Sequence, residues 1–182
     1  MNITVYCGAG FGNDVSLKEQ VELFGKKIAQ AGDRLVFGGS ETGLMGVLAD
    51  AVLSEGGSVT GVELKYFAEK NLSHTGLSEL LVADTLSGRK QMMIDRGDAF
   101  VALPGGAGTL DEISEIITLK NIGILDKPCI LFNWKGYYEP LAAFYDQMRA
   151  ARFMNWDIRQ LVYLAEDAED IMKGTRQGGE RQ

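Results

Sequence analysis

Short apolar runs recur along the chain at intervals typical of strands that alternate with helices. Most of these runs are apolar at consecutive positions, as in strands that are covered on both faces. They lie at residues 3–7, 34–38, 58–62, 79–83, 99–103, 129–133 and 161–164. The segments between them repeat apolar residues with a helical period, at 16–31, 43–55, 88–96, 109–122, 137–151 and 167–173.

This alternation predicts an α/β fold with a doubly wound, mostly parallel sheet of about seven strands and helices on both faces. A chain of 182 residues is long enough to bury one substantial core. No change of composition suggests a linker before the polar stretch 174–182. We therefore expect one nucleotide-binding-type domain over residues 1–173, followed by a flexible tail at 174–182.

Charge and cysteine content narrow the classes of partner. The formal net charge is −7, and no cluster of Lys and Arg suggests a nucleic-acid surface. Cys7 and Cys129 each lie within an apolar run, so we expect buried free thiols in a reducing compartment. The chain has no signal-like start and no run near the roughly 20 apolar residues that span a bilayer. These features predict a cytoplasmic protein that contacts neither membrane nor nucleic acid.

Glycines gather directly after three of the predicted strands. They are Gly8, Gly10 and Gly12 after the first strand, Gly38 and Gly39 after the second, and Gly105, Gly106 and Gly108 after the fifth. In sheets of this kind, ligands bind beyond the carboxyl ends of the strands. The spacing after the first strand is not that of a dinucleotide fingerprint, and no cluster ends in the Gly-Lys-Ser/Thr of a P-loop. NAD binding and ATP hydrolysis are therefore disfavoured.

The segment "LPGGAGTLDE" (103–112) combines a glycine turn with the start of a helix that we expect to open at Thr109. Glycines let main-chain N–H groups approach a ligand, and the positive end of a helix favours an anion, most naturally a phosphate. Thr109 and Glu112 also match a capping box, in which the glutamate would only stabilise the helix start. Spacing alone leaves Glu112 open between that role and chemistry, whereas Asp111 fits a surface acid.

Two cations stand at the start of another predicted helix. With Ser87 as the N-cap, Arg89 and Lys90 fall in the first turn, where the helix dipole disfavours positive charge. Solvent exposure would make the penalty small. A bound anion or a facing carboxylate such as Glu112 would offset it, and we favour this second explanation.

The remaining motifs carry less. "GGSET" (38–42) approaches a nucleophile elbow but lacks its last glycine, and the single histidine, His74, has little room for the acid of a triad. A catalytic His74 is therefore disfavoured against a hydrogen-bonding role. No group of residues has metal-ligand spacing, so we expect no metal. In the predicted helix 43–55, which follows "GGSET", Met45 and Gly46 fit either packing or contact with a flat ligand. Gly43 lets the turn before this helix close.

The segments "GGSETGLMG" (38–46), "GRKQMM" (88–93) and "ALPGGAGTLDE" (102–112) resemble, in order and spacing, the LOG (lonely guy) family. Its members are cytokinin riboside 5′-monophosphate phosphoribohydrolases, many of them bearing the older label "possible lysine decarboxylase". The resemblance covers residues 3–154 and implies a Rossmann-like homodimer without cofactor or metal. It implies cleavage of the N-glycosidic bond of a purine nucleoside 5′-monophosphate, with Arg89 and Glu112 as the catalytic pair.

The resemblance places the phosphate signature on residues 105–109, and the loops together give the expected substrate contacts. These are Gly8, Gly39, Ser40, Gly43, Met45, Gly46, Lys90, Gly105, Gly106, Gly108 and Thr109. The chain departs from the usual family pattern at Ser40, Gly88, Leu119 and Asn121. These departures leave open whether isopentenyl-type bases or plain adenine are preferred. A nucleotide-binding carrier or sensor that uses the same loops without turnover is the alternative from another class.

Overall fold

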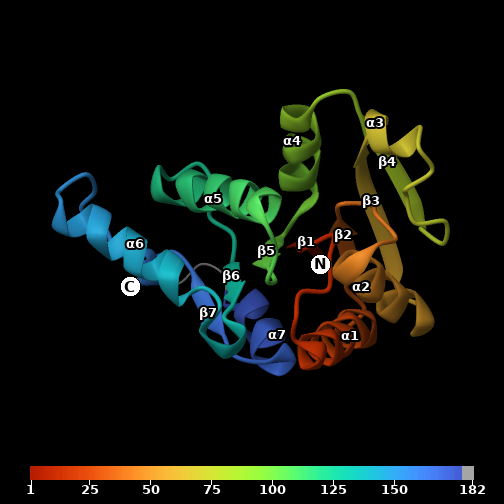
Figure 1. Cartoon of the computed structure of the whole chain (residues 1–182), viewed down its shortest axis with the longest axis horizontal. Helices are drawn as coiled ribbons and strands as arrows, with labels where there is room; N and C mark the ends of the chain where they lie inside the picture. The colour runs from red at the N-terminus through yellow and green to blue at the C-terminus, as the bar shows by residue number, and fades with distance from the viewer. Residues whose placement is uncertain (178–182) are drawn as a thin grey trace.

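The computed structural model describes residues 1–177, which form one parallel sheet flanked by helices (Figure 1). The strands are β1 (Asn2–Tyr6), β2 (Arg34–Phe37), β3 (Ser58–Leu64), β4 (Glu79–Ala83), β5 (Ala99–Ala102), β6 (Cys129–Phe132) and β7 (Tyr163–Ala165). The α-helices are α1 (Val15–Gln30), α2 (Gly43–Ser54), α3 (Lys65–Ala68), α4 (Leu86–Arg96), α5 (Ala107–Asn121), α6 (Glu139–Ala150) and α7 (Ala168–Arg176). Two short 3₁₀ helices are η1 (Trp134–Gly136) and η2 (Ile158–Gln160).

The order of strands confirms the doubly wound arrangement. In the part of the chain that the structure describes, seven strands pair in parallel in the order β4-β3-β2-β1-β5-β6-β7. The chain therefore starts at the centre, runs to one edge, returns to β5 beside β1 and runs to the other edge. The reversal between β1 and β5 is the topological switch point, where ligand sites form in such sheets.

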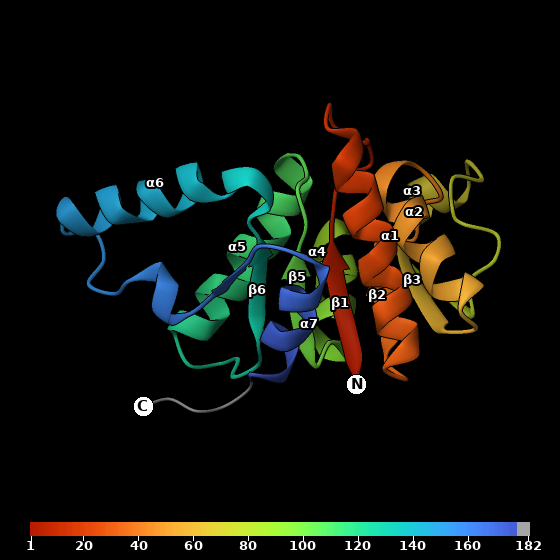
Figure 2. The same ribbon diagram turned by 90° about the horizontal axis from the view of Figure 1, so that it is seen from below.

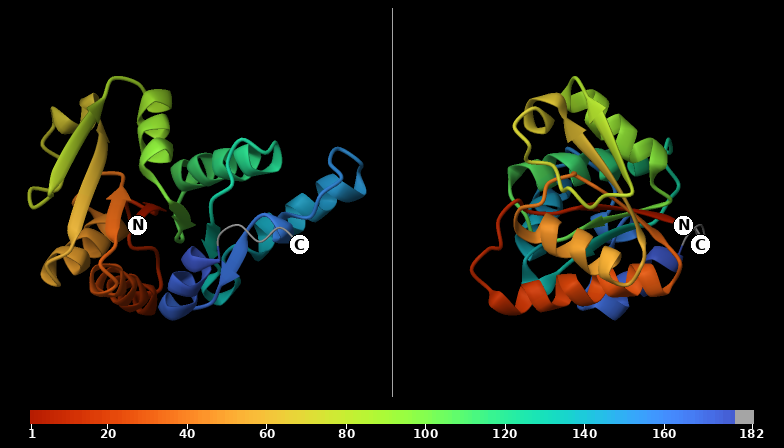
Figure 3. Two further views of the ribbon diagram at one scale, coloured as in Figure 1. Left: turned by 180° about the vertical axis from the view of Figure 1, so that it is seen from behind. Right: turned by 90° about the vertical axis from the view of Figure 1, so that its right-hand side faces the viewer.

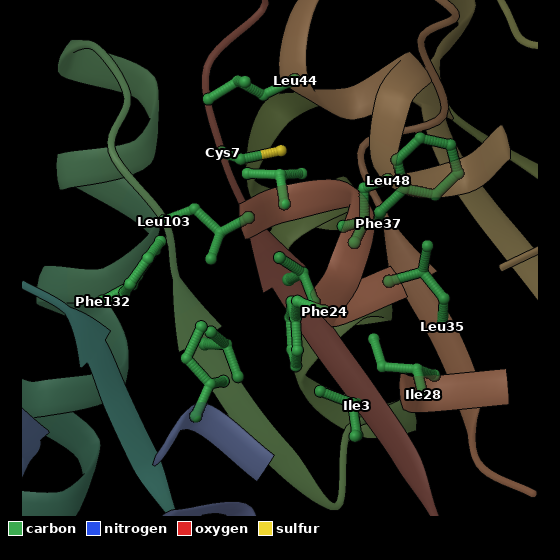
Figure 4. Close-up of a cluster of buried hydrophobic side chains, with 14 of the residues drawn as sticks. Ile3, Cys7, Phe24, Ile28, Leu35, Phe37, Leu44, Leu48, Leu103 and Phe132 are labelled. Carbon is green, nitrogen blue, oxygen red and sulfur yellow. The ribbon is translucent and has the colours of Figure 1, made fainter. Parts of the chain in front are cut away.

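Both faces of the sheet are covered, which explains why the strand sequences are apolar throughout. Helices α1, α2 and α7 cover one face, and α4 and α5 cover the other (Figure 3). Side chains alternate between two cores, so that Val5 and Phe37 pack toward α1 and α2 while Tyr6 and Val36 pack on the opposite face. Figure 4 shows the first core, which includes Phe24 of helix α1 and Phe37 of strand β2.

The two cysteines are buried free thiols, as expected. Burial raises the pKa of Cys129 to about 12, and it also raises the pKa of Cys7 well above the ordinary value. None of the helices in residues 1–177 combines the length and apolarity that a bilayer crossing requires. Helix α6 projects away from the rest of the fold at the β7 end of the sheet (Figure 2).

Three helices begin before the expected residue, each because another group takes the capping position. Helix α1 starts at Val15, one residue before the expected segment 16–31, because the Asp14 carboxylate caps it and accepts from the Ser16 N–H at 3.0 Å. Helix α4 is capped by Thr85, whose hydroxyl accepts from the Gly88 N–H at 3.0 Å, rather than by Ser87. Helix α5 starts at Ala107, with Gly106 as its N-cap.

The C-terminal helix extends further than the sequence indicates. Helix α7 continues through Arg176, so residues 174–176 belong to it rather than to a tail. Thr175 is buried, and the Arg176 guanidinium pairs with the buried carboxylate of Asp33 at the start of β2. These tertiary contacts hold a polar stretch in helical form. Residues 178–182 of the expected tail lie outside the described residues.

Candidate functional site

A cleft of about 480 Å³ lies at the carboxyl edge of the sheet. The ends of β1, β2 and β3 form it together with side chains of α2, α3 and α4 and the N-terminal part of α5. Its lining includes the polar or glycine positions Gly8, Gly38, Ser40, Glu63, Arg89, Gly106, Gly108, Thr109 and Glu112. Apolar side chains form the rest of the wall, among them Met45, Leu64, Phe67, Leu72 and Leu86. The cleft therefore has one end rich in main-chain donors and another that is largely apolar.

Arg89 and Glu112 form an ion pair inside this cleft. Arg89 Nη1 donates to Glu112 Oε1 at 2.6 Å, and the two side chains are only 12% and 11% exposed. The rest of the guanidinium is also anchored, because Nε donates to the Val62 carbonyl at 2.8 Å and Nη2 to the Gly38 carbonyl at 3.4 Å. A fork of donors held in three directions has one orientation, so the charge is preorganised.

The ion pair excludes one of the two roles that the sequence left open for Glu112. Helix α5 begins at Ala107, so Thr109 is its third residue and cannot be the N-cap, and Glu112 faces Arg89 instead of the main chain. The capping-box reading of Glu112 is therefore wrong. Burial raises the pKa of Glu112, while the charge and hydrogen bond of Arg89 oppose that shift. From the sequence, we expect a carboxylate to face the cations at the start of α4. Glu112 is that carboxylate for Arg89.

The first turn of α5 supplies the donors at the other end of the cleft. The N–H groups at the start of a helix lack intrahelical acceptors, and here they carry no side-chain cap. Gly106, Gly108 and Thr109 line the cleft at this point, together with Gly8 from the loop after β1. Gly105 lies behind them, where a Cβ would stand 2.2 Å from Thr109 Oγ1 and 2.9 Å from the Gly8 nitrogen. Gly105 thus lets the two loops meet and does not line the cleft.

Other expected contacts shape the backbone rather than the cleft surface. Gly43 has φ of 62°, and a Cβ there would stand 2.2 Å from the Ala9 carbonyl oxygen. A Cβ at Gly46 would stand 2.0 Å from the Glu41 carbonyl oxygen. Gly39, with φ of 88°, packs against Glu63. Ser40 and Met45 do line the cleft.

Lys90 and His74 lie elsewhere. The Lys90 ammonium bridges Asp111 and Glu115 at 3.0 Å each on the outer side of α5, which raises its pKa. His74 Nδ1 accepts from the Gly76 N–H at 3.0 Å, so Nε2 carries the proton that faces Asp50 at 2.9 Å. His74 therefore ties the β3–β4 connection to α2, and neither side chain is among those that line the cleft.

Sequence reasoning missed Glu63 and the apolar wall. Glu63 is the penultimate residue of β3, lies beside Gly39 of the loop after β2 and is only 3% exposed. An acid directly after the predicted strand 58–62, on the edge that bears the glycines, was the available signal. Phe67 lies on the short helix α3, which no periodicity indicated. Within residues 1–177, histidine, cysteine and carboxylate side chains do not gather in a group of three that could ligate a metal.

Comparison with known proteins places the chain in a family. A family model described as "Possible lysine decarboxylase" matches residues 45–175. A cytokinin riboside 5′-monophosphate phosphoribohydrolase of Rhodococcoides fascians is 39% identical over 96% of this chain and 89% of its own length. A probable enzyme of the same name from Oryza sativa subsp. japonica is 37% identical over 96% of this chain and 78% of its own length.

Solved structures share the fold at lower identity. The Moco carrier protein from Chlamydomonas reinhardtii matches with a TM-score of 0.74 and 21% identity, covering 97% of this chain and 95% of that one. The molybdenum cofactor binding protein from Rippkaea orientalis matches with a TM-score of 0.71 and 19% identity over 94% and 93%. The sequence identity to the phosphoribohydrolases, over nearly the whole chain, shows that this protein belongs to their family, the LOG family.

Proposed function

We propose that this protein hydrolyses the N-glycosidic bond of a purine nucleoside 5′-monophosphate and releases the free base and ribose 5-phosphate. One observation carries the proposal: the buried Arg89–Glu112 pair stands in the same cleft as the uncapped first turn of α5. The names of the most similar relatives, all phosphoribohydrolases of cytokinin riboside monophosphates, support the same reaction.

The first turn of α5 binds the 5′-phosphate. Its free N–H groups and the helix dipole favour an anion, and no acidic side chain stands in that turn. Gly106 and Gly108 present main chain without side chains between the donors and the ligand. With the phosphate bound at this turn, the ribose next to it lies beside the Arg89–Glu112 pair. Binding of the phosphate thus positions the bond that breaks.

Glu112 acts on the sugar. As the C1′–N bond breaks, positive charge develops on the ribose ring, and a nearby carboxylate stabilises it or orients the attacking water. The water oxygen bonds to C1′, and the bonding electrons leave with the base, which takes up a proton. Arg89 favours the ionised form of Glu112 against the effect of burial. The low exposure of both groups strengthens this interaction.

The apolar end of the cleft suits a purine, and Met45, Phe67 and Leu72 there provide contact for a flat ring. AMP and cytokinin riboside monophosphates are the substrate class. We further propose a homodimer, which the exposed apolar side chains Leu110, Phe144 and Phe153 on and beside α5 and α6 support. The two buried free thiols support a cytoplasmic location.

The decisive experiment is Glu112→Gln, which keeps the size of the side chain and removes its charge. Release of ribose 5-phosphate from AMP should fall at least about a hundredfold while the far-UV circular dichroism spectrum and Tm are kept. Asp111→Asn is the matched control, because that neighbouring acid pairs with Lys90 outside the cleft. If the wild-type protein releases no ribose 5-phosphate from any nucleotide yet binds AMP, a carrier role replaces the enzyme.

The older decarboxylase description has little support in the cleft. Amino-acid decarboxylation by pyridoxal phosphate needs a lysine that forms a Schiff base with the cofactor. No lysine is among the described residues that line the cleft. Purified protein mixed with pyridoxal phosphate should show no absorption near 420 nm that depends on a cleft residue. Lysine decarboxylation by the protein would contradict the proposed function.

A further inference from the structure

Glu63 has a feature that folding alone does not explain. It is the penultimate residue of β3, is 3% exposed and lines the cleft. Its Oε1 accepts from the N–H of the adjacent Leu64 at 3.1 Å, whereas Oε2 accepts no hydrogen bond from the described residues. A buried carboxyl with one local partner costs stability, and a leucine of similar size would avoid that cost. An unpaired acceptor in a ligand cleft points to a partner on the ligand.

The position of Glu63 selects the part of the ligand that it meets. The phosphate-binding turn follows β5, and the sheet order from there is β5-β1-β2-β3. Strands lie about 4.8 Å apart, so Glu63 stands about 14 Å across the sheet from that turn. A carboxyl group also repels a phosphate from its own end of the cleft. The nucleotide therefore directs its base toward β3, with the Arg89–Glu112 pair between the two ends.

The surroundings of Glu63 limit what it can bind there. Leu64, Phe67 and Leu72 contribute apolar surface around this end of the cleft. Arg89, whose Nε is bonded to the carbonyl of Val62, is the nearest positive charge and is already paired with Glu112. In this apolar part of the cleft, Glu63 distinguishes ligands that can donate a hydrogen bond from ligands that cannot. An unpaired polar group, on the protein or on the ligand, costs binding free energy there.

We propose that Glu63 recognises the base of the substrate, because its Oε2 accepts a hydrogen bond from the exocyclic amino N–H of a 6-aminopurine. The site would thus select adenine-type bases, including those with a single substituent on the amino nitrogen, which keep one N–H. This inference rests on the proposed function and names the residue that recognises the amino group of its substrate. It makes Glu63 a specificity-determining residue and leaves the Arg89–Glu112 pair as the catalytic one.

The test compares AMP with purine riboside 5′-monophosphate, which lacks only the amino group, in the wild type, Glu63→Gln and Glu63→Leu. The wild type should prefer AMP in kcat/KM, and the ratio should fall about tenfold or more in Glu63→Leu, with Glu63→Gln between them because its amide oxygen still accepts. The Kd values of the two nucleotides are measured as well, so their ratio tests the role of Glu63 even if no turnover occurs. Glu41→Gln, an exposed acid on the neighbouring loop, is the control.

Stability separates this role from a structural one. If Glu63 serves the ligand, Glu63→Leu keeps or raises Tm while discrimination is lost. A lower Tm with an unchanged AMP preference would overturn the inference. An unchanged ratio in active variants would overturn it as well and leave the hydrolase intact. Nucleotide binding without any turnover would refute the proposed reaction, and the Kd ratio would still decide the role of Glu63.

Discussion

Gly38 lies directly against the guanidinium of Arg89, so that a Cβ at position 38 would stand 2.6 Å from Arg89 Nη2. The glycine at the end of β2 is thus what permits an arginine from α4 to reach across the cleft to Glu112. A second atom, Met45 Sδ, would stand 2.8 Å from that Cβ, and both atoms belong to flexible side chains that can move at little cost to the fold. We therefore expect a side chain at position 38 to disturb the position of Arg89 more than it lowers the stability of the protein.

Gly38→Ala should therefore displace Arg89 and lower kcat/KM for AMP at least about tenfold, with a change in Tm of a few degrees at most. Gly10→Ala is the matched control, because a Cβ there meets no atom within 4 Å. Initial rates of ribose 5-phosphate release and thermal melts measure the two effects. Equal activity of both variants would show that the orientation of Arg89 is not critical.

The 5′-phosphate should be essential to the substrate. If the first turn of α5 anchors it, adenosine loses the contacts that position the ribose, and its kcat/KM should be at least about a hundredfold below that of AMP. Inorganic phosphate should inhibit cleavage of AMP competitively. Free base is measured by chromatography for both substrates at the same concentration. Similar rates for adenosine and AMP would remove the phosphate-binding role of Gly106, Gly108 and Thr109.

The two thiols should be unreactive in the folded protein. Burial raises the pKa of Cys129 to about 12 and shifts that of Cys7 in the same direction, so the reactive thiolate is scarce at pH 8. Ellman's reagent should titrate fewer than one thiol per chain at pH 8 and two in guanidinium chloride. Cys7 lines the cleft, so any slow reaction of the native protein should be slower still with AMP bound. Rapid reaction of both thiols without denaturant would contradict their burial.

The contact between the C-terminal helix and the sheet should contribute to stability but not to activity. Asp33 is buried and pairs with Arg176 of α7 and with the N-terminal amine of Met1, so Asp33→Ala leaves both cations without their partner and should cost about 2 kcal/mol in the free energy of unfolding. Urea unfolding gives this value, and kcat/KM should stay within about twofold of the wild type. Glu169→Ala, which removes the exposed partner of Lys27, is the comparison and should have a much smaller effect.

The order of elements and the edge that bears the site could be predicted from the sequence. Apolar runs such as 99–103 are local signals, and a strand covered on both faces needs no further information to be recognised. The glycines after β1, β2 and β5 then marked the carboxyl edge, because parallel strands end on the same side. The helix starts were less predictable, since Thr85 and Ser87, or Gly106 and Thr109, are caps of similar strength and the sheet-to-helix turn chooses between them.

The sequence by itself determined the class of fold, the burial of both cysteines and the glycine turn that leads into a helix at 104–109, because each depends on residues that are neighbours in the chain. Only the tertiary structure decided that Glu112 faces Arg89 rather than its own helix start, that Lys90 turns to Asp111 and Glu115, and that Glu63 enters the cleft. These outcomes join elements far apart in sequence. They depend on how α4 and α5 pack on the sheet. They also depend on the absence of a side chain at Gly38, which leaves room for the Arg89 guanidinium beside the Gly38 carbonyl.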